Sequence, residues 1–412
     1  MNVLLRKDAE TILRKSIAAV QPDAAVKRAL QDLHPGSGRV FLVSVGKAAW
    51  QMARAALDCL GDQVDSGVVI SKYGHIKGAL PRCECFEAGH PIPDQNGFTA
   101  TARAIDLVND AGKNDTVLFL LSGGGSALFE QPLIPDVELQ GITGQLLSCG
   151  ADIVEMNTIR KRLSGVKGGR FAEACAPARI FQVILSDILG DPLDMIASGP
   201  ACPDTTTCAD ALGVAKRYGL KLSEQAYACL QQETPKQLDN VETHITGSVR
   251  ELCAAAADAC SSLGYEPVIL TDHLDCEARE AGRFLGAIAN TYAAQGTKRA
   301  FLAGGETVVH LTGHGLGGRN QELALAAAPL LAGISNVAVF SVGSDGTDGP
   351  TDAAGGYVDG QTQAKLDSKG MSIREVLAEN DAYHALQAVE GLIVTGPTGT
   401  NVNDLSVVLL QG

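Results

Sequence analysis

Two short stretches combine residue types that could bind a phosphate. Lys47 follows the predicted strand 39–45 and a glycine, and residues 122–126, Ser-Gly-Gly-Gly-Ser, follow the apolar run 116–121. Consecutive glycines allow positive φ angles and let backbone N–H groups approach a ligand with no Cβ in the way. A lysine is a compact positive charge suited to phosphate. The pattern predicts an anion site with the candidate residues Lys47, Ser122, Gly123, Gly124, Gly125 and Ser126.

Both stretches also have a simpler interpretation. Lys47 could be a solvated surface lysine, and the triple glycine could mark only a tight turn with close packing. The spacing G-x-x-x-x-G-K-[ST] of a Walker A loop is absent from the chain, and no G-x-G-x-x-G with a suitable acid beyond it follows the first strand. The anion cradle is therefore a hypothesis that rests on the glycines themselves.

Five basic residues fall close together in this acidic chain: Arg160, Lys161, Arg162, Lys167 and Arg170. On a helix, successive side chains point progressively away from one another, so they cannot all face one ligand. Most of the five are expected to be solvated or ion-paired. Arg160 is the candidate for binding a carboxylate or a phosphate.

The loop after the apolar residues 181–185 carries Asp187 and Asp191. A carboxylate there could accept the proton of an attacking hydroxyl, or hold Mg²⁺ with water completing its shell. Loop aspartates also cap helices and turns. Asp191 directly precedes a proline and suits an N-cap, so the chemistry is assigned to Asp187.

The densest glycine region lies in the second half, at residues 304–305 and 315–318. Arg319 follows at the start of a predicted helix, where its charge opposes the helix dipole. A ligand phosphate would explain an arginine there, and pairing with Glu322 or Glu306 is the alternative.

Residues 344–349 resemble the start of an EF-hand loop in composition, but Gly356 stands where such a loop needs a glutamate. A nucleotide or magnesium contact by this loop is considered instead.

Length and composition bound the remaining possibilities. The 412 residues exceed the roughly 250–300 at which a single core stops growing, so two domains are expected. The net charge of −14 argues against a nucleic-acid partner, although local cations can still bind a small anion. Eleven cysteines without a C-x-x-C pair favour reduced thiols in a cytoplasmic protein. No export segment or membrane span is expected, nor a structural zinc on the histidines.

Apolar strands alternate with helices in both halves and end in glycine-rich loops at 46–47, 122–126, 186–191, 304–306, 343–349 and 396–401. Open α/β sheets bind ligands at the carboxyl ends of their strands. The pattern predicts two α/β domains, residues 1–238 and 239–412, with the active site in the cleft between them. The polar residues 233–246 are the expected linker, and residues 307–311 are expected to form a short strand.

Several long motifs resemble the class II glycerate 2-kinases, whose C-terminal portion is called the MOFRL domain. In order, from about residue 40 to residue 409, they are GHPIPDQNG, LLSGGGSALF, MNTIRKRLSGVKGGR, ILSDILGDPLDMIASGP, AGGETVVHLTGHGLGGRNQELALA, SVGSDGTDGPTDAAGG and GPTGTNVNDL. The resemblance covers nearly the whole chain and is specific.

This resemblance implies a larger Rossmann-like N-terminal domain and a smaller C-terminal α/β domain with the MOFRL region at about 298–410, flanking the active cleft. It implies ATP-dependent phosphorylation of D-glycerate at its 2-hydroxyl, with Mg²⁺, to give 2-phosphoglycerate and ADP. The family's leading catalytic candidates are a lysine in the first strand–helix turn and an arginine in the GGRNQE motif. They match Lys47 and Arg319.

For this reaction we assign roles to the other candidates. Asp187 is expected to orient or deprotonate the 2-hydroxyl, while Lys47 and Arg319 neutralise charge on the γ-phosphoryl group. Loop 122–126, with Asn157 and Arg160, is expected to hold the glycerate carboxylate or the phosphoryl group. ATP is expected to bind at Gly305, Glu306, Gly317, Gly318, Asn320 and Asp345. The metal-binding carboxylates and any homo-oligomer stay open.

Relatives in this family often carry the label hydroxypyruvate reductase, so an NAD(P)H-dependent reductase is the alternative. No dinucleotide fingerprint supports that label. A catalytically silent sensor of small hydroxy acids is a third interpretation, and the presence of Lys47 and Arg319 counts against it.

Overall fold

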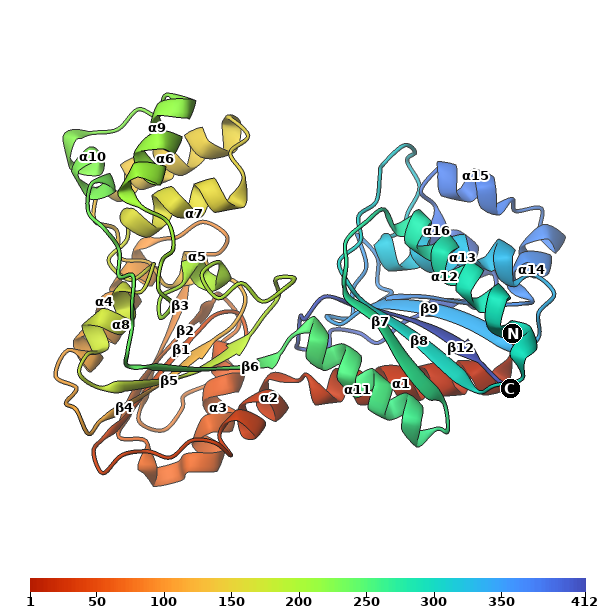
Figure 1. Ribbon diagram of the computed structural model, residues 1–412, viewed down its shortest axis with the longest axis horizontal. Coiled ribbons are helices and arrows are strands. Elements are labelled where there is room, and N and C mark those ends of the chain that lie inside the picture. Colours follow the sequence, from red (N-terminus) through yellow and green to blue (C-terminus); the bar gives the residue numbers. More distant parts are fainter. The chain divides into compact units, whose positions relative to one another are not determined.

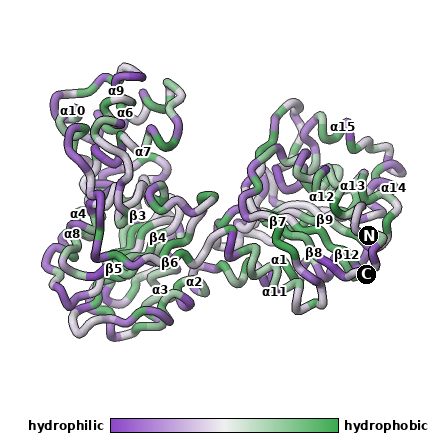
Figure 2. The backbone as a smooth tube through the Cα atoms, in the orientation of Figure 1, coloured by the Kyte–Doolittle hydropathy of each residue, from purple (hydrophilic) through white to green (hydrophobic).

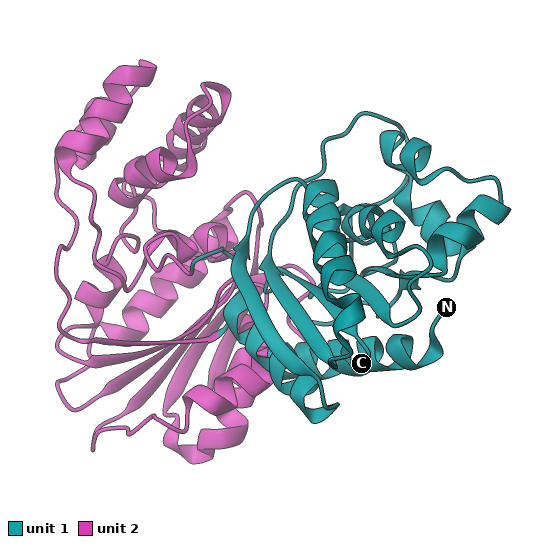
Figure 3. Ribbon diagram, turned by 45° about the vertical axis from the view of Figure 1, so that its right-hand side comes forward, with its two compact units in different colours: residues 1–21, 187–190, 247–412 teal, residues 22–186, 191–246 magenta.

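The structure is a computed structural model that describes all 412 residues, Met1–Gly412. The chain forms two compact units, coloured separately in Figure 3. Unit 1 comprises Met1–Gln21, Asp187–Gly190 and Gly247–Gly412, and unit 2 comprises Pro22–Ser186 and Asp191–Thr246. Residues 1–21 therefore pack in unit 1. The domain limits 1–238 and 239–412 stay a prediction.

Unit 2 is built on a six-stranded sheet with the order β3-β2-β1-β4-β5-β6 (Figure 1). The strands are β1 (Val40–Val45), β2 (Ser66–Lys72), β3 (Cys83–Ala88), β4 (Thr116–Leu121), β5 (Arg179–Leu185) and β6 (Val241–Gly247). The pairs β1–β2, β2–β3, β1–β4 and β4–β5 are all parallel. Every residue of β1 and β4 is buried, as in central strands covered on both faces. The parallel α/β architecture predicted from the sequence is confirmed.

Helices flank this sheet. α2 and α3 share a core with Leu42, Leu118 and Phe181 of the strands, and α4 and α8 also pack against the sheet. Four further helices, α6, α7, α9 and α10, bury a small core of their own. The helices and 3₁₀ turns are α2 (Pro22–Ala29), α3 (Ala49–Leu60), η1 (Gly61–Gln63), α4 (Gln95–Val108), α5 (Gly125–Leu128), α6 (Asp136–Ser148), α7 (Ile153–Arg162), α8 (Arg170–Cys175), η2 (Ile196–Ser198), α9 (Cys208–Tyr218) and α10 (Glu224–Leu230).

The strand order of this sheet reverses at β1, because β2 and β3 lie on one side of it and β4 and β5 on the other. In open α/β sheets, ligands bind outside the carboxyl ends of the strands at such a switch point. Lys47 follows β1 and the loop 122–126 follows β4, so both lie at this position. The two turns approach closely: a Cβ on Gly46, whose φ is 122°, would lie 2.2 Å from Ser122 Oγ.

Unit 1 contains a second six-stranded sheet, with the order β11-β10-β9-β12-β8-β7. Its strands are β7 (Glu266–Leu274), β8 (Arg299–Gly305), β9 (Val337–Gly343), β10 (Gly355–Asp359), β11 (Leu392–Ile393) and β12 (Asp404–Leu410). β7 and β8 pair in parallel, while β12 is antiparallel to both β8 and β9. β8 and β9 therefore run in the same direction, and their last residues, Gly305 and Gly343, both pair with Asp404.

Two layers of helices cover the unit 1 sheet. α1 and α11 contribute to one core cluster, and α12, α13 and the short C-terminal helices contribute to another. Hydrophobic residues are concentrated in the strands (Figure 2). The helices and 3₁₀ turn are α1 (Val3–Ala19), α11 (Val249–Ser262), α12 (Ala278–Tyr292), η3 (Ala293–Gln295), α13 (Arg319–Leu331), α14 (Thr362–Ser368), α15 (Ile373–Ala378) and α16 (Ala382–Ala388).

Two local predictions differ from the structure. Residues 233–246, predicted as a linker, include most of strand β6. The polar, half-buried side chains of this edge strand hide it from hydrophobic patterning. Residues 307–311, predicted as a strand, form none, and Val308 and Leu311 are 57% and 78% exposed. Val308 makes only an isolated bridge to Glu277, so no neighbouring strand extends the pairing along these residues.

Replacing Gly46 by alanine is expected to destabilise the protein by about 2–4 kcal/mol, because the methyl group would overlap Ser122 in a backbone already at positive φ. Gly61→Ala is the matched control. Gly61 also has a positive φ, of 54°, but nothing lies within 4 Å of its Cβ position. That variant should lose only about 1–2 kcal/mol. Urea denaturation followed by circular dichroism measures both, and equal losses would show that the contact with Ser122 is relaxed.

Candidate active site

One group of candidate residues lies in unit 2, at the ends of β1 and β4. The amide of Lys47 donates to the carbonyl of Gly123 (2.9 Å), and the amide of Ala48 donates to Ser122 Oγ (3.1 Å). These bonds hold the two turns together. The Lys47 side chain is exposed and pairs with no carboxylate of the chain, so its charge is available to a ligand.

The loop between β4 and α5 presents bare backbone amides. Gly124 has a φ of 88°, and the amides of Gly123, Gly124, Gly125 and Ser126 donate no hydrogen bond within the chain. Successive unsatisfied N–H groups in a turn form an anion-binding concavity. The geometry is the one that an anion cradle requires, and the bound anion itself stays a prediction.

Arg160 and Asn157, both on α7, are engaged with the chain around this loop. The Arg160 guanidinium donates to the carbonyl of Ser126 (3.1 Å), and burial lowers its pKa. Ser198 Oγ donates to Asn157 Oδ1 (2.8 Å) and lies 3.3 Å from Ser126 Oγ. Both α7 residues thus support the glycine loop. Their direct contact with a ligand stays a prediction.

The turn that carries Ser198 is an unpredicted part of the site. Ala197 and Ser198 have φ angles of 51° and 61°, which non-glycine residues rarely adopt. A Cβ on Gly125 would lie 2.7 Å from the Cβ of Ala197, so this turn packs directly on the glycine loop. Such strain concentrates at functional sites. Only the string Ser-Gly-Pro at residues 198–200 hinted at a special turn.

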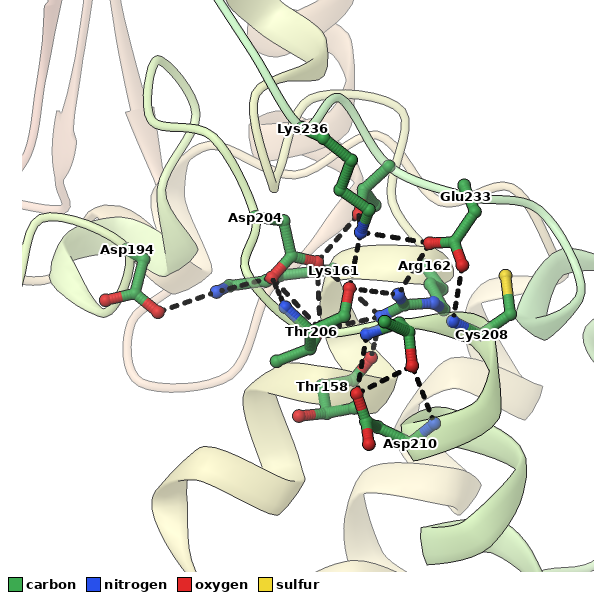
Figure 4. A network of polar contacts seen from close by, with 12 residues as sticks. Thr158, Lys161, Arg162, Asp194, Asp204, Thr206, Cys208, Asp210, Glu233 and Lys236 are labelled. Atoms are coloured by element: carbon green, nitrogen blue, oxygen red, sulfur yellow. Dashed lines mark hydrogen bonds and ion pairs between the residues drawn. The ribbon is translucent and has the colours of Figure 1, made fainter.

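Lys161 and Arg162 are buried in a network around Asp204, drawn in Figure 4. Lys161 Nζ lies 3.1 Å from Asp194 Oδ2 and 3.2 Å from Asp204 Oδ1, and Arg162 Nη1 lies 3.5 Å from Asp204 Oδ2. Burial opposes the charged form of Asp204, but a hydrogen bond from Thr234 and the charge of Lys161 outweigh it and lower the pKa. These cations stabilise the fold and are not available to a ligand.

The other two basic residues of the stretch are also internal. Lys167 Nζ lies 2.5 Å from Glu130 Oε2, with both side chains buried. Burial lowers the pKa of Lys167 to about 8, against the opposing effect of Glu130. Arg170 donates to three backbone carbonyls in or just after α7. The expectation that most of the five residues are paired is confirmed, but they are buried rather than solvated.

A separate group of candidate residues lies in unit 1, where β8 and β9 end. Arg319, the first residue of α13, places Nε and Nη2 at 2.5 and 3.0 Å from the two carboxylate oxygens of Asp404. Its Nη1 lies 3.2 Å from Glu306 Oε1, and 35% of the side chain is exposed. Burial opposes the charge of Arg319, but Asp404 and Glu306 outweigh it and raise the pKa. Glu306 is thus one of the two partners considered from the sequence, whereas Glu322 pairs with Arg279.

Asp348 satisfies the N-terminus of α13. Its carboxylate accepts hydrogen bonds from the amides of Asn320 (3.1 Å) and Gln321 (2.8 Å). A Cβ on Gly318 would lie 2.4 Å from Asp348 Oδ1, so this cap requires a glycine there. Burial raises the pKa of Asp348 to about 6, although the two amide bonds oppose the shift. Because Asp348 already supplies a negative group at the N-terminus of α13, the helix dipole gives no reason to expect a phosphate there. Arg319 remains a candidate for binding the phosphoryl group because part of its side chain is exposed.

Other predicted nucleotide-binding residues have packing roles. Asn320 is buried and accepts a hydrogen bond from the Ser341 hydroxyl at 2.6 Å. A Cβ on Gly305 would lie 2.2 Å from the backbone oxygen of Leu274, and one on Gly317 would lie 3.3 Å from its nearest neighbour. The two glycines thus allow neighbouring backbone segments to approach closely, and Asn320 links α13 to β9. Their contact with a nucleotide stays a prediction.

Asp187 belongs to unit 1, although β5, which precedes it, belongs to unit 2. Its carbonyl accepts a hydrogen bond from Asn403 Nδ2 (3.2 Å), which also donates to Glu306 Oε2 (3.1 Å). Because Glu306 pairs with Arg319, the structure brings Asp187 and Arg319 into one group of residues. Asp345 lies at the same edge: the Cβ position of Gly343 is 3.2 Å from Asp345 Oδ1 and 3.5 Å from Asp404 Oδ1.

Comparisons with known proteins agree with this arrangement. Residues 8–231 match the family described as a domain of unknown function (DUF4147), and residues 299–404 match the MOFRL family. A D-glycerate 2-kinase of Thermotoga maritima is 52% identical over 412 residues, covering 98% of each chain. The chain belongs to the glycerate 2-kinase family.

Further relatives fit the same family. A crystal structure of a glycerate kinase from Thermotoga maritima superposes with a TM-score of 0.94 at 51% identity, covering 98% of this chain and 99% of that one. A protein of Agrobacterium vitis, provisionally named a hydroxypyruvate reductase, is 39% identical over 428 residues and covers 99% of this chain and 95% of its own. No helix of this family member has the length and apolar character needed to span a membrane.

Sequence reasoning missed several residues of this family member's site, among them Asp404, Asp348, Asn403 and Ser198. The signals for Asp404 were its place at the start of an apolar stretch and its inclusion in the motif GPTGTNVNDL. Neither indicated that it lies beside the ends of two other strands. Asp348 caps a helix that begins 29 residues earlier, a pairing that no local pattern predicts.

Asp204→Asn is expected to destabilise the protein by about 3–5 kcal/mol, because it leaves Lys161 and Arg162 buried with less compensating charge. Asp58→Asn is the control: Asp58 pairs with Arg54 at 2.9 Å, but about half of each side chain is exposed. That variant should lose less than about 1 kcal/mol. Thermal and urea unfolding measure both losses, and a small loss at Asp204 would mean that water reaches the network.

Asp348→Asn is expected to change the pH dependence of stability. The folded pKa of about 6 lies above the usual 3.8, so the folded state binds this proton more tightly. The stabilisation that the protonated Asp348 carboxyl provides is complete below pH 3.8 and is lost as the pH rises through 6. The free energy of unfolding of the wild type should therefore fall relative to the variant by roughly 3 kcal/mol between about pH 4 and 7. A pH-independent difference in urea unfolding would contradict this.

Proposed function

We propose that this chain transfers the γ-phosphoryl group of ATP to the 2-hydroxyl of D-glycerate, giving 2-phosphoglycerate and ADP. The observation that carries the proposal is the unpaired Lys47 beside four free amides at the switch point of the sheet. It occurs in a chain 52% identical to a D-glycerate 2-kinase.

Lys47 and the loop 122–126 would act on negative charge. In phosphoryl transfer the protein mainly positions the reactants and stabilises charge on the moving group. The exposed ammonium of Lys47 can approach that group, and the amides of residues 123–126 can hold it or the glycerate carboxylate. Arg160, Asn157 and Ser198 would keep the loop in this conformation.

Arg319 would supply the second positive charge. Asp404 and Glu306 fix its guanidinium while leaving part of it exposed, so it needs little reorganisation to meet the γ-phosphoryl group. We assign the acceptance of the 2-hydroxyl proton to Asp187. As that proton leaves, the 2-oxygen bonds to the γ-phosphorus, the bond from that phosphorus to the bridging oxygen breaks, and ADP departs.

The nucleotide and Mg²⁺ would bind at the glycine-rich strand ends of unit 1, with Glu306 and Asp345 as the accessible side chains. No group of three or more histidine, cysteine, aspartate or glutamate side chains could hold a metal by itself. This fits Mg²⁺, which one or two carboxylates usually hold together with phosphate oxygens and water. Asp345 would be such a carboxylate, and the bound metal would neutralise phosphate charge. All eleven cysteines are free, which fits the cytoplasm as the proposed location.

A hydroxypyruvate reductase is the alternative, named for one relative. The letters G-x-G-x-x-G occur at residues 313–318, directly before α13. No strand leads into them, and Cβ positions on Gly313 and Gly315 would overlap the backbone of residues 379–381. A dinucleotide fingerprint needs a strand before it and an open approach to the pyrophosphate. The kinase is therefore the better-supported function.

Assays with the purified protein distinguish the two activities. With ATP, Mg²⁺ and D-glycerate, ³¹P NMR should show 2-phosphoglycerate rather than 3-phosphoglycerate, with one ADP formed per product. With hydroxypyruvate and NADH or NADPH, absorbance of the nicotinamide should not change. Nicotinamide oxidation without ADP formation would overturn the kinase.

Lys47→Ala and Arg319→Ala should each lower kcat by about 10²–10³-fold, since each removes a charge that stabilises the transition state. Lys77→Ala and Arg374→Ala are matched controls, because both side chains are exposed and unpaired, and they should leave kcat unchanged. Arg319→Lys keeps the charge near Asp404 if the alanine variant misfolds, and should still lose activity because the bidentate geometry is lost. Near-normal turnover by Lys47→Ala or Arg319→Lys would remove that residue from the mechanism.

A further inference from the structure

A second group of basic residues lies at the ends of β2 and β3, where Lys72 is the register partner of Ala88. Lys72 is the last residue of β2, and His90 follows β3 by two positions. Burial lowers the pKa of His90, and the nearby positive charges of Lys47, Lys72 and His75 lower it further. No carboxylate appears among the groups that act on this imidazole. The end of the sheet around Gly124 is thus locally cationic.

The imidazole of His90 lies directly on the glycine loop. The Cβ position of Gly124 is 3.0 Å from His90 Cδ2, 3.1 Å from His90 Nε2 and 3.3 Å from Lys47 Cγ. His90 and Lys47 therefore flank the same point of the loop from two different elements. Neither ring nitrogen of His90 has a hydrogen-bond partner in the chain.

The segment that presents His90 is held in place. Asp94 accepts a hydrogen bond from the amide of Gly97 (3.0 Å) and caps α4. The hydroxyl of Tyr73 donates to Asp94 (2.7 Å), and a Cβ on Gly89 would lie 2.6 Å from the carbonyl oxygen of Ile92. The compact turn at 89–94 thus places His90 beside the glycine loop.

This group differs from the other cations of unit 2. Lys161, Arg162 and Lys167 are buried against carboxylates. Lys72, like Lys47, pairs with none. In a chain with a net charge of −14, two unpaired lysines and an unpartnered imidazole around bare amides favour an anionic ligand.

We propose that Lys72 and His90 form the subsite for the carboxylate of the acceptor. This assignment rests on the proposed function and deepens it. In a 2-hydroxy acid the carboxylate carbon is bonded to the carbon that bears the reacting hydroxyl. Donors for the carboxylate must therefore stand next to Lys47, which is assigned to the phosphoryl group. Lys72 offers a positive charge there, and the His90 imidazole offers a ring nitrogen without a partner in the chain. The subsite makes the enzyme selective for 2-hydroxy acids over uncharged alcohols.

The test compares D-glycerate with its methyl ester, which lacks the carboxylate charge. In the wild type, kcat/KM should strongly favour the acid. In His90→Gln and Lys72→Met the KM for D-glycerate should rise at least about tenfold, and the preference for the acid should fall by a similar factor, while the KM for ATP stays unchanged. Lys77→Met is the matched control, because that exposed lysine is not among the charges acting on His90, and it should leave all three values unchanged.

A loss that affects both compounds and ATP equally would indicate a merely structural role and would overturn the subsite. NMR titration of the His90 ring in the wild type provides a measurement that does not depend on turnover. D-Glycerate should raise the pKa of His90, because a nearby carboxylate favours the imidazolium, and the methyl ester should not. A pKa that neither compound changes overturns the subsite. A wild type that binds D-glycerate in this way but transfers no phosphoryl group would overturn the proposed function alone.

Discussion

The close approach of Gly46 to Ser122 is the constraint on which the site in unit 2 depends. Two central strands end side by side at the point where the strand order reverses, and only a residue without a Cβ fits between their turns. This contact determines the direction in which Lys47 leaves β1. It also leaves the amides of the glycine loop without partners in the chain. The proposed anion site would thus be a consequence of backbone packing, to which the side chains around it would add charge and selectivity.

Two classes of cations bear on the candidate residues. One class is buried and neutralised, as Lys161 and Arg162 are by Asp204 and as Lys167 is by Glu130. The other class lies at strand ends and keeps its charge available: Lys47 pairs with no carboxylate, and Arg319 remains partly exposed although Asp404 and Glu306 orient it. A lysine or arginine can bind an anion strongly only where a carboxylate of the protein has not already neutralised its charge. The second class is therefore the one that we propose for phosphoryl transfer, while the first stabilises the surrounding loops.

The sequence was sufficient for the parallel sheet of unit 2, for the strand-end positions of Lys47 and the glycine loop, and for Arg319 at the start of α13. Each depends on neighbours within a few residues. The sequence did not predict the contact of Asp404 with Arg319, which lies 85 residues away. It also did not predict that Asp348 caps α13 from a loop beyond the helix. The strand β6 was missed because an edge strand needs no alternation of apolar residues. The burial of Lys161 and Arg162 could not be read from α7, since the carboxylates that permit it come from later loops.

The most direct test of the central claim is a crystal structure of the protein with ADP, Mg²⁺, aluminium fluoride and D-glycerate. The fluoroaluminate group imitates the phosphoryl group in transfer. The account predicts that this group is held by the Lys47 ammonium and the amides of residues 123–126, with the Arg319 guanidinium also in contact and the 2-hydroxyl of glycerate in line with it. A fluoroaluminate bound elsewhere, with Lys47 and the glycine loop in contact with solvent alone, would contradict it.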